Sequence, residues 1–217
     1  MRDERGFTLV ELMIAAAITA AVLGGTIVLA SQLQQVYSTQ LDDTTVEEEV
    51  RFALDWIAQT LRNAGSNPYA LDSLAGSCAG AGTFAAIAMN PDGASPTDDS
   101  IRIQADINPP DGLLGGAAAS LDCEDDNGED ITIAFDADEM VITREDMSGS
   151  DGPVVMTEPV IADLEFVYLN SARTVTTDPD LVTYVRVRVT GRSQAYNALL
   201  GENTETTLET EVRVRTR

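Results

Sequence analysis

The chain has 217 residues and a formal net charge of −23 at pH 7, with 36 acidic residues against 13 basic ones. All 13 basic residues are arginine, and the sequence contains neither lysine nor histidine. Without histidine there is no imidazole base or His-ligated metal, and without lysine there is no Schiff base, so we do not expect an enzyme. The anionic surface repels nucleic acid, so we expect no direct nucleic-acid partner. The acidic excess fits either a high-salt habitat or divalent-cation binding.

The first thirty residues comprise a short charged leader and a long apolar segment. The leader, residues 1–6, contains two arginines and ends at Gly6, and the apolar segment, residues 7–30, contains one ionisable residue, Glu11. About 20 helical residues cross a bilayer core, so this segment is long enough to span a membrane. The leader arginines predict that the leader stays in the cytoplasm and the remainder is sent outward. Because Gly6 precedes the apolar segment, a cut there keeps that segment in the mature protein, unlike the cut of a secretory signal peptide.

Glu11 is the feature that an ordinary membrane anchor does not explain. A carboxylate at mid-membrane costs about 2.5–3.5 kcal/mol on insertion scales, and less near a helix end, so it needs a partner. A cut after Gly6 creates an α-amino group at Phe7, four residues away in the same chain or on a neighbouring subunit. We therefore predict that Glu11 pairs with this amine. A single-pass anchor whose Glu11 reaches the interface is the alternative, but it accounts neither for Gly6–Phe7 nor for the position of the acid.

The order G-F-T-L-V-E followed by a membrane-length apolar segment resembles the class III signal of type IV prepilins and type II secretion pseudopilins. The resemblance implies cleavage after Gly6 by a prepilin peptidase that also N-methylates Phe7. It implies that Glu11 neutralises the N-terminus of the adjacent subunit and sets the axial register. The implied partners are other pilins or pseudopilins and an inner-membrane assembly platform. The implied location is the inner membrane, single-pass with the head in the periplasm, and then a surface filament or a periplasmic pseudopilus.

Beyond the apolar segment, the periodicity predicts that the helix continues to about residue 64. Gly65 is placed as a terminator and Pro68 prevents a restart, which gives a helix about 85 Å long. Phe52 and Trp56 are expected to widen its apolar face. The glycine pair at residues 24–25 is either a weak point that unwinds on assembly or a site of close helix packing. The predicted apolar stripe consists of Val46, Val50, Ala53, Leu54, Ile57, Ala58 and Leu61.

The sequence VRFALDWIAQTLRNAG, residues 50–65, resembles the pattern that ends the long helix of PilW-type minor pilins, with J-type pseudopilins of type II secretion next. Its basic members, Arg51 and Arg62, either pair with nearby carboxylates or contact another subunit. The strand D-L-E-F-V-Y-L and the alternating strand V-R-V-R-V are similar to those of PilW-type and J-type heads. The resemblance thus extends weakly over most of the chain.

The remainder of the chain reads as an antiparallel β-rich head. The last two strands alternate arginine with valine and are expected to pair, with one face packed and one face wet. Their arginines either meet cross-strand acids or form a basic face that docks the acidic stretch of a neighbour. These arginines are Arg186, Arg188, Arg192, Arg213 and Arg215, with Arg217 at the end. The predicted strands cover residues 83–89, 100–107, 130–135, 140–144, 160–169, 181–191 and 208–217.

Cys78 and Cys123 are the only cysteines, and in an oxidising compartment they allow one intrachain disulfide. Closing a loop of about 45 residues would stabilise the head by about 4 kcal/mol in the chain-entropy model. The acidic sequence DCEDDNGED, residues 122–130, either forms a solvated turn or holds Ca²⁺ through oxygen ligands, although it does not match an EF-hand loop. No cofactor is required by this interpretation. The candidate calcium ligands are Asp122, Glu124, Asp125, Asp126 and Asp130.

The expected fold class is α+β, with a long N-terminal helix packed on an antiparallel β-sheet head, as in pilins. Its parts are the leader 1–6, the membrane and filament-core helix 7–30, the amphipathic continuation 31–65 and the head 66–217. The expected function is that of a minor pilin, a structural subunit of a type IV pilus that assembles through its N-terminal helix and primes filament assembly. The alternatives are a J-like pseudopilin of type II secretion and a calcium-dependent adhesive head displayed on a pilus.

Overall fold

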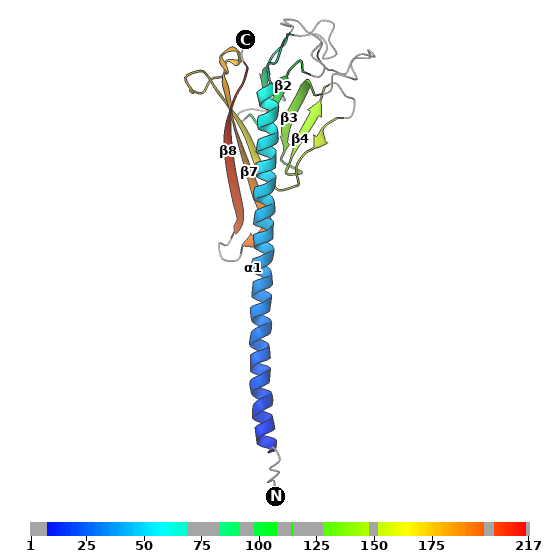
Figure 1. Cartoon of the computed structure of the whole chain (residues 1–217), viewed down its shortest axis with the longest axis vertical. Coiled ribbons are helices and arrows are strands. Elements are labelled where there is room, and N and C mark those ends of the chain that lie inside the picture. The colour runs from blue at the N-terminus through cyan, green and yellow to red at the C-terminus, as the bar shows by residue number, and fades with distance from the viewer. Residues whose placement is uncertain are drawn as a thin grey trace.

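The computed structural model consists of one long helix with two antiparallel sheets packed along its upper half (Figure 1). It describes residues 8–68, 83–91, 98–107, 114, 128–147, 152–197 and 202–215. The helix α1 (Leu9–Asn63) has 55 residues, which at 1.5 Å per residue makes it about 82 Å long. This confirms the α+β class and the continuous helix.

The ends of α1 are fixed by capping groups. At the lower end Thr8 is the N-cap residue, and its hydroxyl accepts a hydrogen bond from the backbone N–H of Glu11. At the upper end the chain leaves the helix through Gly65, which has a φ of +75° and donates its N–H to the carbonyl of Gln104 at 3.0 Å. A side chain at Gly65 would also collide with the carbonyl of Arg215. Glycine is therefore required at this terminator for both conformation and space.

The two halves of α1 have different surroundings. The lower half exposes its large apolar side chains, and α1 is long and apolar enough to cross a membrane by length and composition. Gly24 and Gly25 have nothing within 4 Å of an added Cβ, which leaves both predicted roles for this pair untested. In the upper half, Phe52 is 49% exposed and lies outside the apolar face that it was expected to widen, while Trp56 is partly buried. The buried residues of α1 are those predicted: Val46, Val50, Ala53, Leu54, Ile57, Ala58 and Leu61.

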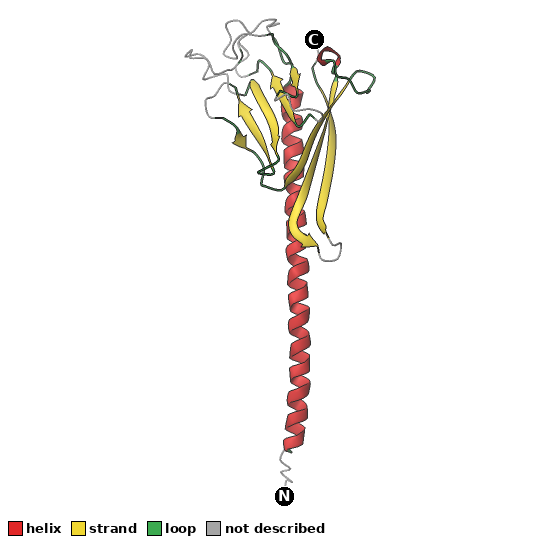
Figure 2. Cartoon of the chain, turned by 180° about the vertical axis from the view of Figure 1, so that it is seen from behind, coloured by secondary structure: helices red, strands yellow, loops and turns green. Residues whose placement is uncertain are grey.

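The head contains two sheets in the described residues, rather than the single sheet that was expected. Both are antiparallel meanders in which neighbours in sequence are neighbours in space, and they lie on either side of α1 (Figure 2). The first contains β1 (Ile87–Met89), β2 (Ser100–Gln104), β3 (Asp130–Asp136), β4 (Val141–Asp146) and β5 (Val154–Val155). The second contains β6 (Ile161–Leu169), β7 (Tyr184–Asn197) and β8 (Glu202–Arg213), with a short 3₁₀ turn, η2 (Pro179–Leu181), before β7.

The core lies between α1 and the inner faces of the two sheets. Val185, Val187 and Val189 of β7 are fully buried, whereas the arginines that alternate with them point away from the helix. Gly191 of β7 is also buried, and a Cβ there would meet Val46 and Val50 of α1 at 2.6 Å each. The absence of a side chain at Gly191 therefore lets the helix approach the sheet closely.

Candidate functional site

The lower end of α1 places the one carboxylate of the apolar segment next to the predicted start of the mature chain. One oxygen of Glu11, Oε2, accepts hydrogen bonds from both the backbone N–H and the hydroxyl of Thr8, each at 2.9 Å. Together with the return bond from the N–H of Glu11 to the Thr8 hydroxyl at 3.3 Å, this is a capping box. Gly6 and Phe7 lie outside the described residues, so processing there stays a prediction.

The capping partner Thr8 was missed by the sequence analysis, although its signal is present. Threonine followed three residues later by glutamate at the start of an apolar helix is the pattern of a capping box. The box turns the Glu11 carboxylate back toward the preceding peptide and sets it at the positive end of the helix dipole. The Glu11 carboxylate therefore lies at the N-terminal end of the helix, against the backbone N–H of Thr8.

From residue 12 to residue 30 the helix surface is apolar on every side. The exposed side chains of this segment include those of Met13, Ile18, Leu23, Ile27 and Leu29, which point in different directions around the axis. A helix that is apolar all round is stable only when lipid or other protein surrounds it. This segment can therefore enter a bilayer, and it can equally pack among helices of the same kind.

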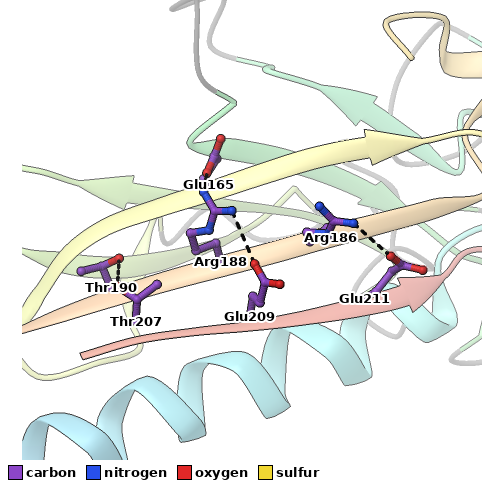
Figure 3. A network of polar contacts seen from close by, with 7 residues as sticks. All are labelled: Glu165, Arg186, Arg188, Thr190, Thr207, Glu209 and Glu211. Atoms are coloured by element: carbon purple, nitrogen blue, oxygen red, sulfur yellow. Dashed lines mark hydrogen bonds and ion pairs between the residues drawn. The ribbon is translucent and has the colours of Figure 1, made fainter. Parts of the chain in front are cut away.

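The outer face of β6, β7 and β8 carries a set of ion pairs across the strands (Figure 3). Arg188 contacts Glu165 of β6 at 2.6 Å and Glu209 of β8 at 3.4 Å, and Arg186 contacts Glu211 at 3.5 Å. At the lower end of the hairpin, Arg192 pairs with Glu205 at 2.7 Å, and Thr190 hydrogen-bonds Thr207 at 3.0 Å. The pairing of the last two strands is confirmed, and their central arginines meet cross-strand acids rather than forming a free basic face.

The two basic residues of the upper helix differ in their contacts. Arg51 pairs with Glu47 one turn earlier at 2.6 Å, in a fully solvated position. Arg62 is exposed, and within the part of the chain that the structure describes it forms no ion pair. The pairing that the sequence analysis offered for both arginines thus holds for Arg51.

Comparison with known proteins finds a known motif at the N-terminus of the chain. Residues 1–27 match the family model for the prokaryotic N-terminal methylation motif. The first 27 residues are therefore similar to that motif. Among solved structures, a type IV-like pilin from Thermus thermophilus is similar over 77% of this chain and 96% of its own, with 9% identity and a TM-score of 0.42. No curated protein matches the chain.

In the head, Asp130 is the one predicted calcium ligand that the structure describes. Its buried carboxylate receives Nε of Arg102 at 2.7 Å, an outer guanidinium nitrogen of Arg102 at 2.6 Å, and the amide of Gln104 at 3.0 Å. These bonds raise the pKa of Arg102 above its ordinary value, against the opposing effect of burial. No group of three metal-ligating side chains is brought together among the described residues. The other four candidate ligands, Asp122, Glu124, Asp125 and Asp126, and both cysteines, Cys78 and Cys123, lie outside them.

Proposed function

We propose that this chain is a structural pilin subunit that is cut after Gly6, N-methylated at Phe7 and assembled through its N-terminal helix. The observation that carries the proposal is a single carboxylate, Glu11, held at the start of an otherwise apolar and uncovered helix. The methylation motif at residues 1–27 supports processing at this point. The mechanism is mechanical: the apolar helices pack against one another in a filament core, and Glu11 supplies the register.

The proposed pairing follows from what the capping box leaves available. Glu11 Oε2 is used by Thr8, whereas Oε1 has no partner among the described residues. A carboxylate oxygen accepts more than one hydrogen bond, so both oxygens can receive the amine of a neighbour while the box persists. Inside an apolar filament core an ammonium–carboxylate pair is far stronger than in water, which makes a misregistered neighbour costly.

The membrane stage precedes assembly in this proposal. The apolar segment holds the chain in the inner membrane, the leader arginines keep residues 1–6 in the cytoplasm, and the head is in the periplasm. A prepilin peptidase and an inner-membrane assembly platform act on it there. The two leader arginines are removed with the leader, so the charge that orients insertion is absent from the assembled subunit.

Within the pilin-like class, we assign the chain to the low-abundance minor pilins of the PilW type, which prime assembly. The helix end at residues 50–65 supports this assignment by its sequence pattern. A pseudopilin of type II secretion is the alternative. Mass spectrometry of filaments sheared from cells distinguishes them, since a trace of chain beginning at N-methyl-Phe7 is expected in surface filaments. Processed chain found only in the envelope would contradict the pilus assignment.

The role of Glu11 has a direct test. Glu11→Ala should leave membrane insertion intact, because it removes a charge from an apolar segment, and should impair incorporation into filaments. Thr8→Val, which removes the capping hydroxyl but keeps the carboxylate, is the matched control and should retain most incorporation. Normal incorporation of Glu11→Ala would refute the proposed role.

A second candidate function, a calcium-dependent adhesive head, rests on the acidic residues 122–130. It is suggested by the acidic composition of that stretch, since Ca²⁺ takes oxygen ligands. Among the described residues no three metal-ligating side chains lie together, and one oxygen of the buried Glu129 carboxylate accepts the N–H of Ile107 at 2.6 Å. Calorimetric titration of the full chain in detergent with Ca²⁺ is the test. Saturable heat that Mg²⁺ does not reproduce would support the site, and no heat at millimolar Ca²⁺ would exclude it.

A further inference from the structure

Three arginines that form no ion pair among the described residues lie together at the upper end of the helix. The structure describes ten arginines, and seven of them form ion pairs. The other three, Arg62, Arg213 and Arg215, have no ion pair among the described residues, and all three line one cavity of about 630 Å³. The cavity is completed by the chain turn at residues 65–68. On a protein with a net charge of −23, three adjacent unneutralised guanidinium groups are a local reversal of charge.

The cavity is a fixed feature of the fold. Gly65 donates its N–H to the Gln104 carbonyl at 3.0 Å and lies against the Arg215 backbone, while Val214 is buried between Arg213 and Arg215. Because side chains alternate along an extended segment, the two arginines flank Val214 on the outward face. The helix end therefore presents Arg62 to the same space as the last described residues of the chain.

The exposed face of the upper helix carries the complementary charge. Glu48, Asp55 and Arg62 are spaced by seven residues, so that successive members differ by about 20° around the axis and form one outward stripe. Glu48 and Asp55 are exposed and, within the described residues, form no ion pair. Phe52 lies between them on the same face and is 49% exposed. Figure 1 shows this part of α1 in front of both sheets, with one long face uncovered.

We propose that this arginine cleft, formed by Arg62, Arg213 and Arg215, receives the Glu48 and Asp55 carboxylates on the outer helix face of a second copy of the chain. Guanidinium groups bind carboxylates through two parallel hydrogen bonds, and the pair of Arg102 with Asp130 on this head already uses that chemistry. Phe52 of the second copy then loses its exposure to water in the contact, which contributes apolar burial beside the charges. The proposal rests on the proposed function as a pilin subunit, and it names the partner and the contact.

The arrangement is head-to-tail, because acids on one copy meet the cleft of another. Two parallel helices in which Arg62 meets Asp55 or Glu48 are offset by seven or fourteen residues, about 10 or 21 Å. Each copy retains a free cleft at one end of the contact and a free acidic stripe at the other. A contact of this kind does not close on itself, so it extends into an open assembly.

The absence of lysine makes the contact directly measurable. In the variant Arg62→Lys, and separately Arg213→Lys and Arg215→Lys, the introduced amine is the only one besides the N-terminus. The full chain is reconstituted in lipid vesicles as a mixture of ¹⁴N and ¹⁵N copies and treated with a carbodiimide, which joins an amine to a carboxylate in contact with it. Peptide mass spectrometry then identifies the carboxylate and shows whether the linkage joins two copies.

We expect mixed-isotope linkages from the introduced lysines to Glu48 or Asp55, and a loss of about tenfold in the total yield of mixed-isotope linkages, to any carboxylate, with the variant Glu48→Gln/Asp55→Asn. The matched control Arg192→Lys should link to Glu205 within one copy, because that pair is intramolecular at 2.7 Å. Linkages confined to a lysine's own chain, or spread evenly over the carboxylates of the second copy, would overturn the proposal. Processing and filament incorporation are scored separately, so failure of the cleft contact in a chain that still enters filaments refutes this inference alone.

Discussion

The packing of Gly191 against the helix gives a sharp prediction for the stability of the head. A Cβ at this position would lie 2.6 Å from a methyl carbon of Val46, 2.6 Å from a methyl carbon of Val50 and 3.5 Å from the Val160 carbonyl oxygen. Both valines are almost completely buried, and a β-branched side chain in a helix has one strongly preferred rotamer. Neither methyl group can rotate away, so Gly191→Ala forces the helix and β7 apart.

The magnitude follows from two opposing effects. Overpacking a filled core costs about 1–3 kcal/mol. Replacing glycine in an extended segment returns about 0.4–1 kcal/mol, because the unfolded chain loses freedom. We therefore expect Gly191→Ala to lower the free energy of unfolding by about 1–2 kcal/mol. The double variant Gly191→Ala/Val50→Ala should be more stable than the sum of its parts, since one change makes the space that the other needs.

Denaturant unfolding of the full chain in detergent, followed by the fluorescence of Trp56, measures these differences. Trp56 is the single tryptophan and is partly buried against the core, so its emission reports separation of the head from the helix. Thr190→Ala, at the neighbouring outward-facing position of β7, is the control and should cost about 0.5–1 kcal/mol, the loss of one hydrogen bond to Thr207, with no coupling to Val50→Ala. A neutral Gly191→Ala, or strict additivity in the double variant, would refute the packing account.

The remaining predictions concern charge, pH and the cysteines. Arg102→Met should lower stability by about 3–5 kcal/mol, because it leaves the fully buried Asp130 carboxylate without its cation. Arg51→Met, which removes only the exposed pair with Glu47, should cost under about 1 kcal/mol, and equal losses in the two variants would contradict this account. Tyr168 is buried, and burial together with nearby negative charge raises its pKa. The contribution of Tyr168 to the free energy of unfolding should therefore be fully present below about pH 10 and be lost as the pH rises further. Tyr168→Phe should remove that alkaline loss in a pH series of unfolding midpoints, and an unchanged profile would exclude Tyr168 as its source. Reduction of the wild-type chain, and Cys78→Ser, should each lower stability by up to about 4 kcal/mol, while reduction should leave Cys78→Ser unchanged; an effect of reduction on that variant would argue against a bond with Cys123.

Periodicity was sufficient to predict the helix. The seven buried residues of its upper half are those of the predicted stripe, because a single helix face of period 3.6 meets the core. Phe52 was assigned wrongly to that face since its size suggested burial, although its angle around the axis places it beside Glu48 and Asp55. Apolar character alone does not show which side of a helix faces the head.

Strand segments in which apolar and polar side chains alternate were predicted from the sequence. Segments that are polar on both faces were missed. In the hairpin of β7 and β8, β7 continues to Asn197, although the predicted strand ended at residue 191. Likewise β8 begins at Glu202, although the predicted strand began at residue 208. This extension is mostly polar, so it gives no period-two signal. Division into two sheets also has no local signature, because it depends on which strand edges pair. The arginine cleft was equally invisible, since it joins Arg62 to residues about 150 positions later in the sequence.

The extended hairpin also determines how far the head stands from a membrane. Its lower end contacts α1 through a hydrogen bond of 3.1 Å from the Ser193 hydroxyl to Asp42, whereas the apolar segment ends at residue 30. The eleven helical residues between them, residues 31–41, are mostly polar, and the distance along the axis from residue 30 to Asp42 is about 18 Å. Lipid headgroups occupy about 5–7 Å of that length. The remaining distance, about 11 Å, exceeds the Debye length of about 8 Å at physiological ionic strength. In the proposed membrane stage, the contact between Ser193 and Asp42 therefore lies more than one Debye length above the headgroups, where salt weakens repulsion from anionic lipids.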